Sequence, residues 1–317
     1  MSAKAAAQDN KPVVRKDISM FSWTINEMKK NKVAYLMIAP FFLLFFIFTV
    51  VPVLLSIFIS FTTFNMLELP KFVGMDNYIR LLLDDEYFLI AIKNTLVFAA
   101  ITGPLSYLLS MFFAWFINEL RPKIRAVVTL FFYAPSIAGN AYLIWTILFS
   151  SDQYGLVNGL LMDLGVINSP ILFFQDKGYI MPLIIIIALW SSLGTSFLTF
   201  IAGFQVVDKS LYEAGAVDGI KNRWQELWFI TLPTMRPQMM LGAILAITGS
   251  FGFGDIITAL VGFPSPDYIA HTIMHHLQDY GGMRFELGYS SAIATILFFM
   301  MVGANLLVTR MIRKVGT

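Results

Sequence analysis

Six long apolar segments divide the 317-residue chain, and they constrain its fold more than any other feature. Each segment has about 20 or more mainly apolar residues, the length that a helix needs to cross the hydrocarbon core of a bilayer. The predicted spans run approximately over residues 36–61, 94–118, 126–149, 179–204, 238–263 and 288–309. Charged residues make up only 13% of the chain, against roughly 25% in soluble domains. We therefore expect an all-α integral membrane protein, a six-span helical bundle.

Glycine and proline occur inside most of the predicted spans, for example at Pro52, Gly103, Pro104 and Pro135. Membrane helices tolerate such residues when neighbouring helices satisfy the freed backbone groups, so a packed bundle is implied. The chain contains no cysteine. This excludes disulfides, thiol catalysis and thiolate metal sites, but it does not identify a compartment.

The positions of Lys and Arg predict the topology. Of the 22 Lys and Arg residues, 17 fall in the first 35 residues, the loops 119–125 and 205–237, and the C-terminal end. Cytoplasmic segments carry this excess, so both termini and the 205–237 loop are expected in the cytoplasm and the acidic 63–93 loop outside. No cleavable signal pattern occurs near Met1, so the first span is expected to remain. We expect a cytoplasmic segment at 1–35 and a six-span domain at 36–317.

Few residues are candidates for catalysis. His271, His275 and His276 lie in the predicted outer loop, and the first two are four residues apart, as ligands on one helical face would be. However, no glutamate follows the HExxH pattern of zinc enzymes, and a structural role is the alternative. No phosphate-binding G-x-x-x-x-G-K-[ST] loop occurs. If ATP drives this protein, another chain must bind it, and we expect no enzyme activity, cofactor or metal on this one.

An ion-coupled carrier usually holds several ionisable groups along its pathway, because buried charges at membrane depth are costly and kept for function. The single deep candidate here is Asp255, in the sequence GSFGFGDIITALVGF. A single carboxylate gives little support to a carrier driven by protons or sodium ions. Alternatively, Asp255 caps or hydrogen-bonds a glycine-rich break near the outer end of its span.

The 205–237 loop, which we call the coupling loop, has balanced charge and helical patterning. Asp208 can cap a short helix, KSLYEAGAV, that Gly219 can end. A second short helix is predicted to place three side chains on one face, Trp224, Leu227 and Trp228. Such an element can insert into the groove of a partner protein, or it can lie on the membrane with tryptophan at the interface. The residues alone leave both interpretations open.

The coupling loop resembles the EAA motif of the membrane subunits of ABC importers. The motif reads Glu-Ala-Ala, three residues, Gly, about nine residues and Ile-x-Leu-Pro. This chain has Glu213-Ala214-Gly215, then Gly219 and, ten residues later, Ile230-Thr231-Leu232-Pro233. Gly215 replaces the second alanine, which keeps a small residue for close packing. The spacer is one residue longer than in the family pattern.

The resemblance extends over nearly the whole chain. The sequence APFFLLFFIFTVVPVLLSIFISF is similar to the first helix of maltose-type carbohydrate permeases. FVGMDNYIRLL, NTLVF and YGLVNGLL occupy places where that family has outer segments and the start of its next helix. The chain is thus identified as similar to the MalF-like partner of a heterodimeric carbohydrate permease, and the resemblance implies the type I ABC importer fold.

The resemblance also implies partners. They would be a second permease subunit, two cytoplasmic ATPase subunits that hold ATP and Mg, and an extracytoplasmic solute-binding protein, all at a bacterial cell membrane; no nucleic acid is implied. The coupling loop would fit into a cleft of the ATPase. The implied coupling residues are Glu213, Ala214, Gly215, Asp218 and Gly219.

Sugars bind through apolar faces that stack on aromatic rings and through hydroxyl groups that pair with polar side chains. The sequences WSSLGTSF and TGSFGFGD provide such residues at membrane depth. The candidate substrate-lining residues are Trp190, Ser191, Thr195, Ser250, Asp255 and Asn140, with Tyr142 and Trp145 as weaker candidates. Trp190 matches a tryptophan of the maltose-type permeases. The Ser and Thr residues also suit simple helix packing, and polyamine, phosphate or an organic anion remain alternative solutes.

Overall fold

The computed structural model describes residue 28 and residues 30–312 of the protein. The chain divides into two units, Met1–Leu55 and Ser56–Thr317, and each is described by itself. Most of the cytoplasmic segment predicted at 1–35 lies outside the described residues, as does the chain beyond 312.

The first unit is helical over its described apolar part. Helix α2 (Lys32–Phe45) continues through a π-helical turn, η1 (Phe46–Val50), into α3 (Val51–Ile59), which runs on into the second unit. The π-helical turn ends two residues before Pro52, whose nitrogen cannot donate a hydrogen bond to the preceding turn. The helical stretch Lys32–Ile59 has 28 residues and is long enough to cross a bilayer.

The second unit begins with a short hairpin and two long helical stretches. The hairpin strands are β1 (Thr62–Thr63) and β2 (Lys71–Phe72), antiparallel with Thr62 opposite Phe72. The next elements are α4 (Asp76–Ile79), the π-helical turn η2 (Arg80–Asp84), α5 (Glu86–Asn118), α6 (Pro122–Ile137), the 3-10 turn η3 (Ala141–Leu143), α7 (Ile144–Leu148) and α8 (Leu156–Asp163).

The remaining elements alternate long helices with short connecting ones. They are α9 (Lys177–Ser191), α10 (Thr195–Val206), α11 (Lys209–Val217), α12 (Arg223–Glu226), η4 (Leu227–Thr231), α13 (Leu232–Thr234), α14 (Arg236–Phe251), α15 (Gly254–Val261), η5 (Pro266–Tyr268), α16 (Ile273–Gln278), η6 (Asp279–Met283) and α17 (Leu287–Ile312). The described residues are therefore mostly helical, as the apolar segments predict.

By length and composition, three single helices in the described residues can cross a membrane, and three bent pairs raise the number to as many as six. The pair α6 and η3–α7 is bent by 87°, α9 and α10 by 42°, and α14 and α15 by 40°. The predicted six spans are confirmed, but residues 126–149 do not form one straight helix. Pro135 lies in the last turn of α6 and Gly139 follows it, and both residue types interrupt helices.

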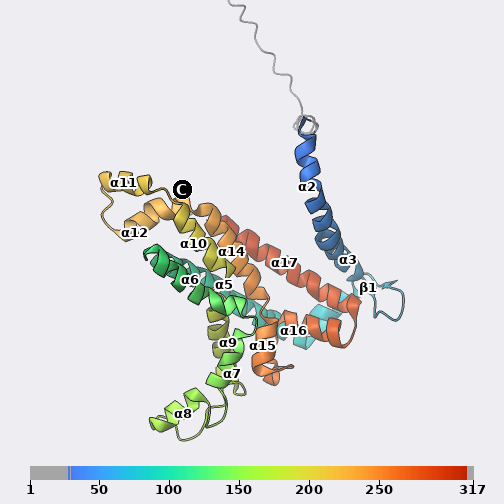
Figure 1. Ribbon diagram of the computed structural model, residues 1–317. Coiled ribbons are helices and arrows are strands. Elements are labelled where there is room, and N and C mark those ends of the chain that lie inside the picture. Colours follow the sequence, from blue (N-terminus) through green and yellow to red (C-terminus); the bar gives the residue numbers. More distant parts are fainter. Residues whose placement is uncertain (1–27, 29, 313–317) are drawn as a thin grey trace, which may run out of the picture. The chain divides into compact units, whose positions relative to one another are not determined.

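Helices α5, α10, α14 and α17 form the packed centre of the second unit (Figure 1). Helix α10 packs on both α5 and α14, while α14 also packs on α17. Close approach depends on glycine: a side chain at Gly242 would meet the Phe200 ring, and one at Gly203 would meet Met235. Small residues let membrane helices approach closely where no hydrophobic effect drives them together.

The hairpin is fixed to the start of α17. The amide of Asn77 donates to the carbonyls of Ser60 and Thr62 at 2.8 and 2.9 Å. The backbone N–H of Gly288 donates to the carbonyl of Phe64 at 3.0 Å. The Thr62 carbonyl occupies the place where a side chain at 288 would begin, so only glycine fits there.

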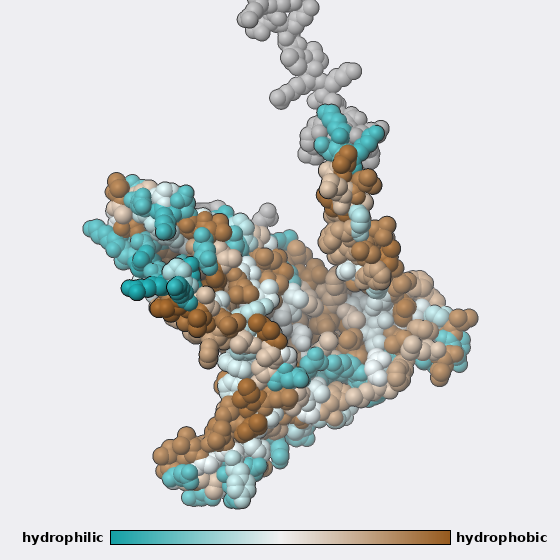
Figure 2. Space-filling view, in the orientation of Figure 1, coloured by the Kyte–Doolittle hydropathy of each residue, from teal (hydrophilic) through white to brown (hydrophobic). Residues whose placement is uncertain are grey.

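Hydrophilic residues gather at one end of the second unit, over α11 and α12, as Figure 2 shows. Hydrophobic residues cover much of the long helices between that end and the opposite one. This distribution suits a bundle whose sides face lipid and whose ends face water.

Candidate functional site

Helix α11 in the coupling loop has well-formed ends. The Asp208 carboxylate accepts from the Ser210 amide at 3.0 Å and caps its start. At its end, the amide of Ile220 donates to the Gly215 carbonyl at 2.9 Å and that of Gly219 to Ala216 at 3.3 Å. This is a Schellman motif, and Gly219 takes the left-handed conformation, φ 95°, that the motif requires. The predicted cap and the predicted stop are both confirmed.

The second half of the coupling loop differs from the prediction. The helix α12 has only four residues and widens at once into the π-helical turn η4, so the regular i, i+3, i+4 spacing is lost. Leu227 is buried, whereas Trp224 and Trp228 are 64% and 63% exposed. Of the three side chains, two are thus exposed and only Leu227 is buried. The ring of Trp224 contacts that of Trp115 on α5, 4.7 Å between centroids.

The predicted coupling residues lie together on α11 and its terminal turn. Glu213, Ala214, Asp218 and Gly219 are exposed, and Gly215 is buried. A methyl group at Gly215 would lie 2.6 Å from Cδ1 of Ile230 in η4. The glycine thus lets η4 support α11 from behind, and it leaves the exposed residues free to meet another molecule.

Contacts between the two halves brace the coupling loop. The Tyr212 hydroxyl on α11 is 2.9 Å from the Thr231 hydroxyl in η4. Arg223 pairs with Glu226 at 2.7 Å and with Glu119, at the end of α5, at 3.2 Å. A cavity of about 730 Å³ lies between the ends of α5 and α6 and the coupling loop, and Glu213 and Arg223 line it. The loop is thus connected to the end of a candidate span.

The predicted substrate-lining residues lie at the breaks of the three bent pairs. Trp190 and Ser191 end α9, and Thr195 begins α10. Asn140 lies in the break after α6, while Ser250 and Asp255 lie on either side of the break between α14 and α15. Non-helical backbone at membrane depth is tolerated only where it is buried in protein or lines a water-filled cavity.

These breaks come together in space. The turn η3 contacts both α9 and α15, and α9 contacts α15. The ring of Trp145 meets the ring of Trp190 edge to face, 5.5 Å between centroids, and Tyr142 donates to Asn140 at 3.1 Å. Three buried polar atoms near these breaks have no hydrogen-bond partner in the part of the chain that the structure describes: Trp145 Nε1, Ser191 Oγ and Thr258 Oγ1. Such atoms are available to water or to a polar ligand.

Like Asn140, Ser250 and Asp255 have side-chain hydrogen bonds within the chain. The buried Ser250 hydroxyl donates to the Ile247 carbonyl at 2.7 Å and packs beside Gly103 of α5. The exposed Asp255 carboxylate accepts from Gln278 at 3.3 Å. Asp255 thus lies in the first turn of α15, where a negative charge favours a helix start.

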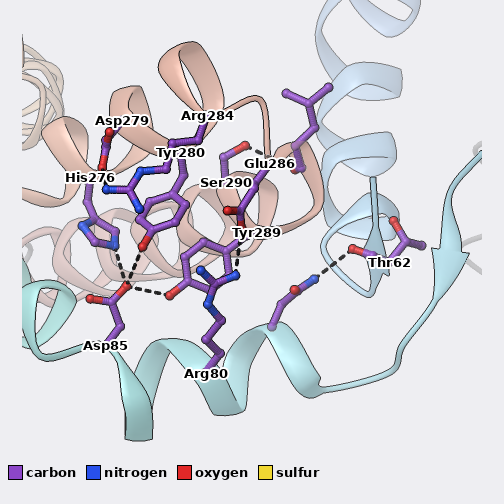
Figure 3. Close-up of polar contacts among 12 residues, drawn as sticks. Thr62, Arg80, Asp85, His276, Asp279, Tyr280, Arg284, Glu286, Tyr289 and Ser290 are labelled. Carbon is purple, nitrogen blue, oxygen red and sulfur yellow. Dashed lines mark hydrogen bonds and ion pairs between the residues drawn. The ribbon is translucent and has the colours of Figure 1, made fainter. Parts of the chain in front are cut away.

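A buried polar cluster that the sequence did not reveal lies where α5 begins. We call Asp85, His276, Tyr280 and Tyr289 the Asp85 cluster (Figure 3). One carboxylate oxygen of Asp85 is 3.0 Å from His276 Nε2, accepts from the Tyr289 hydroxyl at 2.8 Å and lies 3.5 Å from that of Tyr280. The other accepts from the Phe88 amide at 3.0 Å and so caps α5. Only the helix cap had a signal in the sequence, namely an Asp three residues before an apolar residue at the start of a helical segment.

His276 belongs to the Asp85 cluster, and His271 and His275 lie beside it with hydrogen bonds of their own. His276 Nδ1 lies 3.2 Å from His271 Nε2, and the Thr272 side chain and His275 form a capping box at the start of α16. Among residues 28 and 30–312, no group of three or more His, Cys, Asp or Glu residues could hold a metal ion. Burial would raise the pKa of Asp85, but hydrogen bonds from His276, Tyr289 and the Phe88 amide hold it well below its usual range.

The comparisons with known proteins agree with this architecture. The chain is 30% identical over 275 residues to the probable ABC transporter permease protein YesP of Bacillus subtilis, which covers 85% of this chain and 86% of that protein. It is 30% identical over 299 residues to the inner membrane ABC transporter permease protein YcjO of Escherichia coli, and the match covers 89% of this chain and 95% of that protein. The arabinooligosaccharides transport system permease protein AraP of Bacillus subtilis is 29% identical, covering 88% of each chain.

A solved structure has the same fold. A chain of a bacterial ABC transporter involved in the import of the acidic polysaccharide alginate superposes with a TM-score of 0.72, at 22% identity, covering 93% of this chain and all of that one. No protein-family model matches the chain. From the similarity to YesP and YcjO over most of both lengths, the chain belongs to the family of ABC transporter permease proteins.

Proposed function

We propose that this chain is one of two permease subunits of an ATP-driven bacterial importer of a sugar or oligosaccharide. The observation that carries the proposal is the coupling loop. A capped short helix, α11, is supported from behind by Ile230 and presents Glu213 and Ala214 to solvent. The loop can insert into the cleft of a cytoplasmic ATPase that holds ATP and Mg, and its contacts with α5 can transmit motion to the spans.

The sugar class is supported by the relatives and by the breaks. AraP is named for arabinooligosaccharides, and LacF of Rhizobium radiobacter, 28% identical, for lactose. The rings of Trp145 and Trp190 and the unpaired Ser191 and Thr258 hydroxyls offer stacking surfaces and hydrogen bonds, which are the groups that sugars require. We propose that Trp190, Ser191, Thr195 and Asn140 line the pathway, with Ser250 and Asp255 at its edge.

A second candidate solute has one observation in its favour. UgpA of Yersinia pestis, 27% identical, is named for sn-glycerol-3-phosphate. An anionic solute would call for basic groups, whereas the six proposed lining residues include the carboxylate of Asp255 and no Lys or Arg. This difference favours a neutral sugar.

The coupling assignment is tested by Glu213→Lys in the assembled transporter. Glu213 is exposed, so the variant is expected to fold, but reversed charge in the ATPase cleft should abolish co-purification of the ATPase and transport. Lys221→Glu, an exposed charge reversal outside the α11 helix, serves as the control. Retained association and uptake in Glu213→Lys would refute the assignment.

The pathway assignment is tested by Trp190→Ala. Removal of the ring should weaken sugar-stimulated ATP hydrolysis, since a stacking face would be lost. Unchanged stimulation would remove Trp190 from the pathway. A single purified chain that moves solute under an ion gradient without an ATPase would instead indicate a secondary carrier.

The proposed topology has both termini in the cytoplasm and a solute-binding protein outside. Because the chain has no cysteine, single cysteines report its sidedness directly. Asp84→Cys and Val217→Cys are both at exposed positions, and an impermeant thiol reagent should label only the first from outside intact cells. Labelling of both from the same side would overturn the topology.

A further inference from the structure

A cavity of about 320 Å³ adjoins the Asp85 cluster but is distinct from the breaks of the bent pairs. We call it the tyrosine cavity. Four aromatic rings line it, from Tyr87 in the first turn of α5, Phe263 and Tyr268 in the loop after α15, and Tyr280 in η6. Its volume is at the lower end of the range for small-molecule sites, which is roughly 300–1,000 Å³. It suits one small ligand rather than a long chain.

The polar groups of the tyrosine cavity carry little net charge. Asp279 and Arg284 face it as an ion pair with a separation of 2.6 Å, and the Arg284 guanidinium lies 4.4 Å from the centre of the Tyr280 ring (Figure 3). Burial, together with the neighbouring His276 and His275, lowers the pKa of His271 to about 3, and Asp85 opposes this shift. His271 is therefore neutral. Aromatic faces combined with a carboxylate and a guanidinium match a neutral ligand that has several hydroxyl groups.

The lining of the tyrosine cavity is held in place by buried contacts. Tyr268 has a left-handed backbone conformation, φ 57°, that costs energy for a residue of this kind. The amide of Asn94 on α5 fixes this segment, because it donates to the carbonyls of Tyr268 and His271 at 3.1 and 2.9 Å. The ring centroids of Tyr87 and Tyr268 are 4.3 Å apart, and one carboxylate oxygen of Asp85 lies 3.0 Å from His276 Nε2. A strained residue fixed from several sides is typical of a ligand clamp.

We infer that the tyrosine cavity is a second carbohydrate site, one that takes a single neutral sugar unit at the outer end of the bundle. The inference rests on the proposed function and deepens it. One apolar sugar face would stack on the rings of Tyr87 and Tyr268, while Asp279 and Arg284 would bind hydroxyl groups. Sugar would thus be held near the outer surface before it reaches the residues at the breaks.

The test uses the complete transporter and the absence of native cysteine. Phe263→Cys places a thiol in the tyrosine cavity and keeps the rings of Tyr87 and Tyr268, and Leu83→Cys, at a 76% exposed position, places one outside it. The rate of maleimide labelling is measured with arabinotriose, lactose or maltotriose, and with sorbitol as a polyol that lacks a ring. At twice the dissociation constant, a bound sugar should slow labelling of Phe263→Cys about threefold.

The supporting result is slowing at Phe263→Cys by at least one of the three sugars, no slowing by sorbitol, and no change at Leu83→Cys. Adding Arg284→Gln to Phe263→Cys should then remove the protection. Equal slowing at both cysteines, protection that survives Arg284→Gln, or no slowing by any sugar at saturating concentration would overturn the inference. ATP-dependent uptake of the same sugars is measured in parallel: uptake without protection refutes the tyrosine cavity alone, whereas absence of uptake across a sugar panel refutes the proposed function.

Discussion

The Asp85 cluster and the coupling loop both join charged and aromatic side chains from several elements, but they bury them to different degrees. His276 is 3% exposed and Asp85 9%, whereas Trp224 in the coupling loop is 64% exposed. The carboxylate of Asp85 accepts from the side chains of three elements and from the backbone that it caps. The Arg223 pairs in the coupling loop lie at the surface.

This difference has an energetic meaning. A buried charge that loses its partner is strongly destabilising, so the Asp85 cluster fixes the relative positions of α5, α16 and α17. Exposed ion pairs contribute about 0–1 kcal/mol each, so the coupling loop can exchange its contacts for those of a partner at small cost. One end of the unit is thus held together by buried contacts, and the other mainly by exposed ones.

The largest expected effect is at Asp85. Asp85→Ala removes the helix cap and leaves His276 and Tyr289 without an acceptor, so it should lower the free energy of unfolding by about 3–5 kcal/mol. Asp85→Asn, which keeps an acceptor, should lose less, and the exposed Asp84→Ala should lose less than about 0.5 kcal/mol. Thermal unfolding of the purified chain in detergent measures all three. Equal stability of Asp85→Ala and Asp84→Ala would contradict the comparison.

Two glycines, Gly288 at the start of α17 and Gly215 in the coupling loop, test the same comparison. In Gly288→Ala the new methyl group meets the rigid backbone carbonyl of Thr62, and we expect a loss of about 1–3 kcal/mol. In Gly215→Ala it meets only the ends of the Ile230 and Ile220 side chains, which can rotate, and alanine gains about 0.5–1 kcal/mol of helix propensity. Gly215→Ala should therefore retain stability and ATPase association. Gly282→Ala, with no atom nearby, is the control.

The buried histidines predict a pH dependence. Burial lowers the pKa of His271 to about 3 and that of His275 to about 4; Asp255 opposes the shift at His275. Both bind protons only when unfolded between about pH 6.5 and pH 4, so stability should fall as the pH falls, by about 1.4 kcal/mol per pH unit for each. Asp85, with its lowered pKa, adds a further loss only below about pH 4.

His275→Gln separates these contributions. Glutamine can keep the capping box with Thr272 but cannot take up a proton. The slope of the free energy of unfolding against pH, above about pH 4, should therefore fall by half. Melting temperatures from about pH 7 to about pH 4.5 measure it. An unchanged slope would mean that His275 is not a source of the acid sensitivity.

The smallest expected effect is at Arg223. Because its pairs with Glu119 and Glu226 are exposed, Arg223→Gln should change the free energy of unfolding by less than about 1 kcal/mol. Chemical denaturation followed by tryptophan fluorescence can detect the change. A loss comparable to that of Asp85→Ala would show that these ion pairs stabilise the protein as much as the Asp85 cluster does.

Local patterns predicted the helical class, the six candidate spans, the Asp208 cap and the Gly219 stop, since each depends on residues within a few positions of one another. The wide turn η4 was not predicted, because a π-helical turn has no distinct composition. The second span was predicted from 94, but α5 begins at Glu86, where the Asp85 cap and not apolarity sets its start.

The Asp85 cluster could not be predicted for a different reason. Asp85 and His276 are 191 positions apart, and nothing in either local sequence encodes their contact. The sequence therefore left the three histidines as metal ligands or as parts of an ordered loop, and only the packing of α16 beside α5 brings His276 to Asp85. The predicted coupling and lining residues are gathered on one short helix and at three breaks, and their roles await the experiments above.

The three interrupted spans have a mechanical consequence. A continuous helix can reorient only as a rod, but at Asn140, Gly194 and Gly252 the ladder of main-chain hydrogen bonds stops and restarts. Each such point is a pivot, about which one half of a span can swing while the other keeps its packing. A bundle with three adjacent pivots can open at one surface and close at the other without any helix having to unwind.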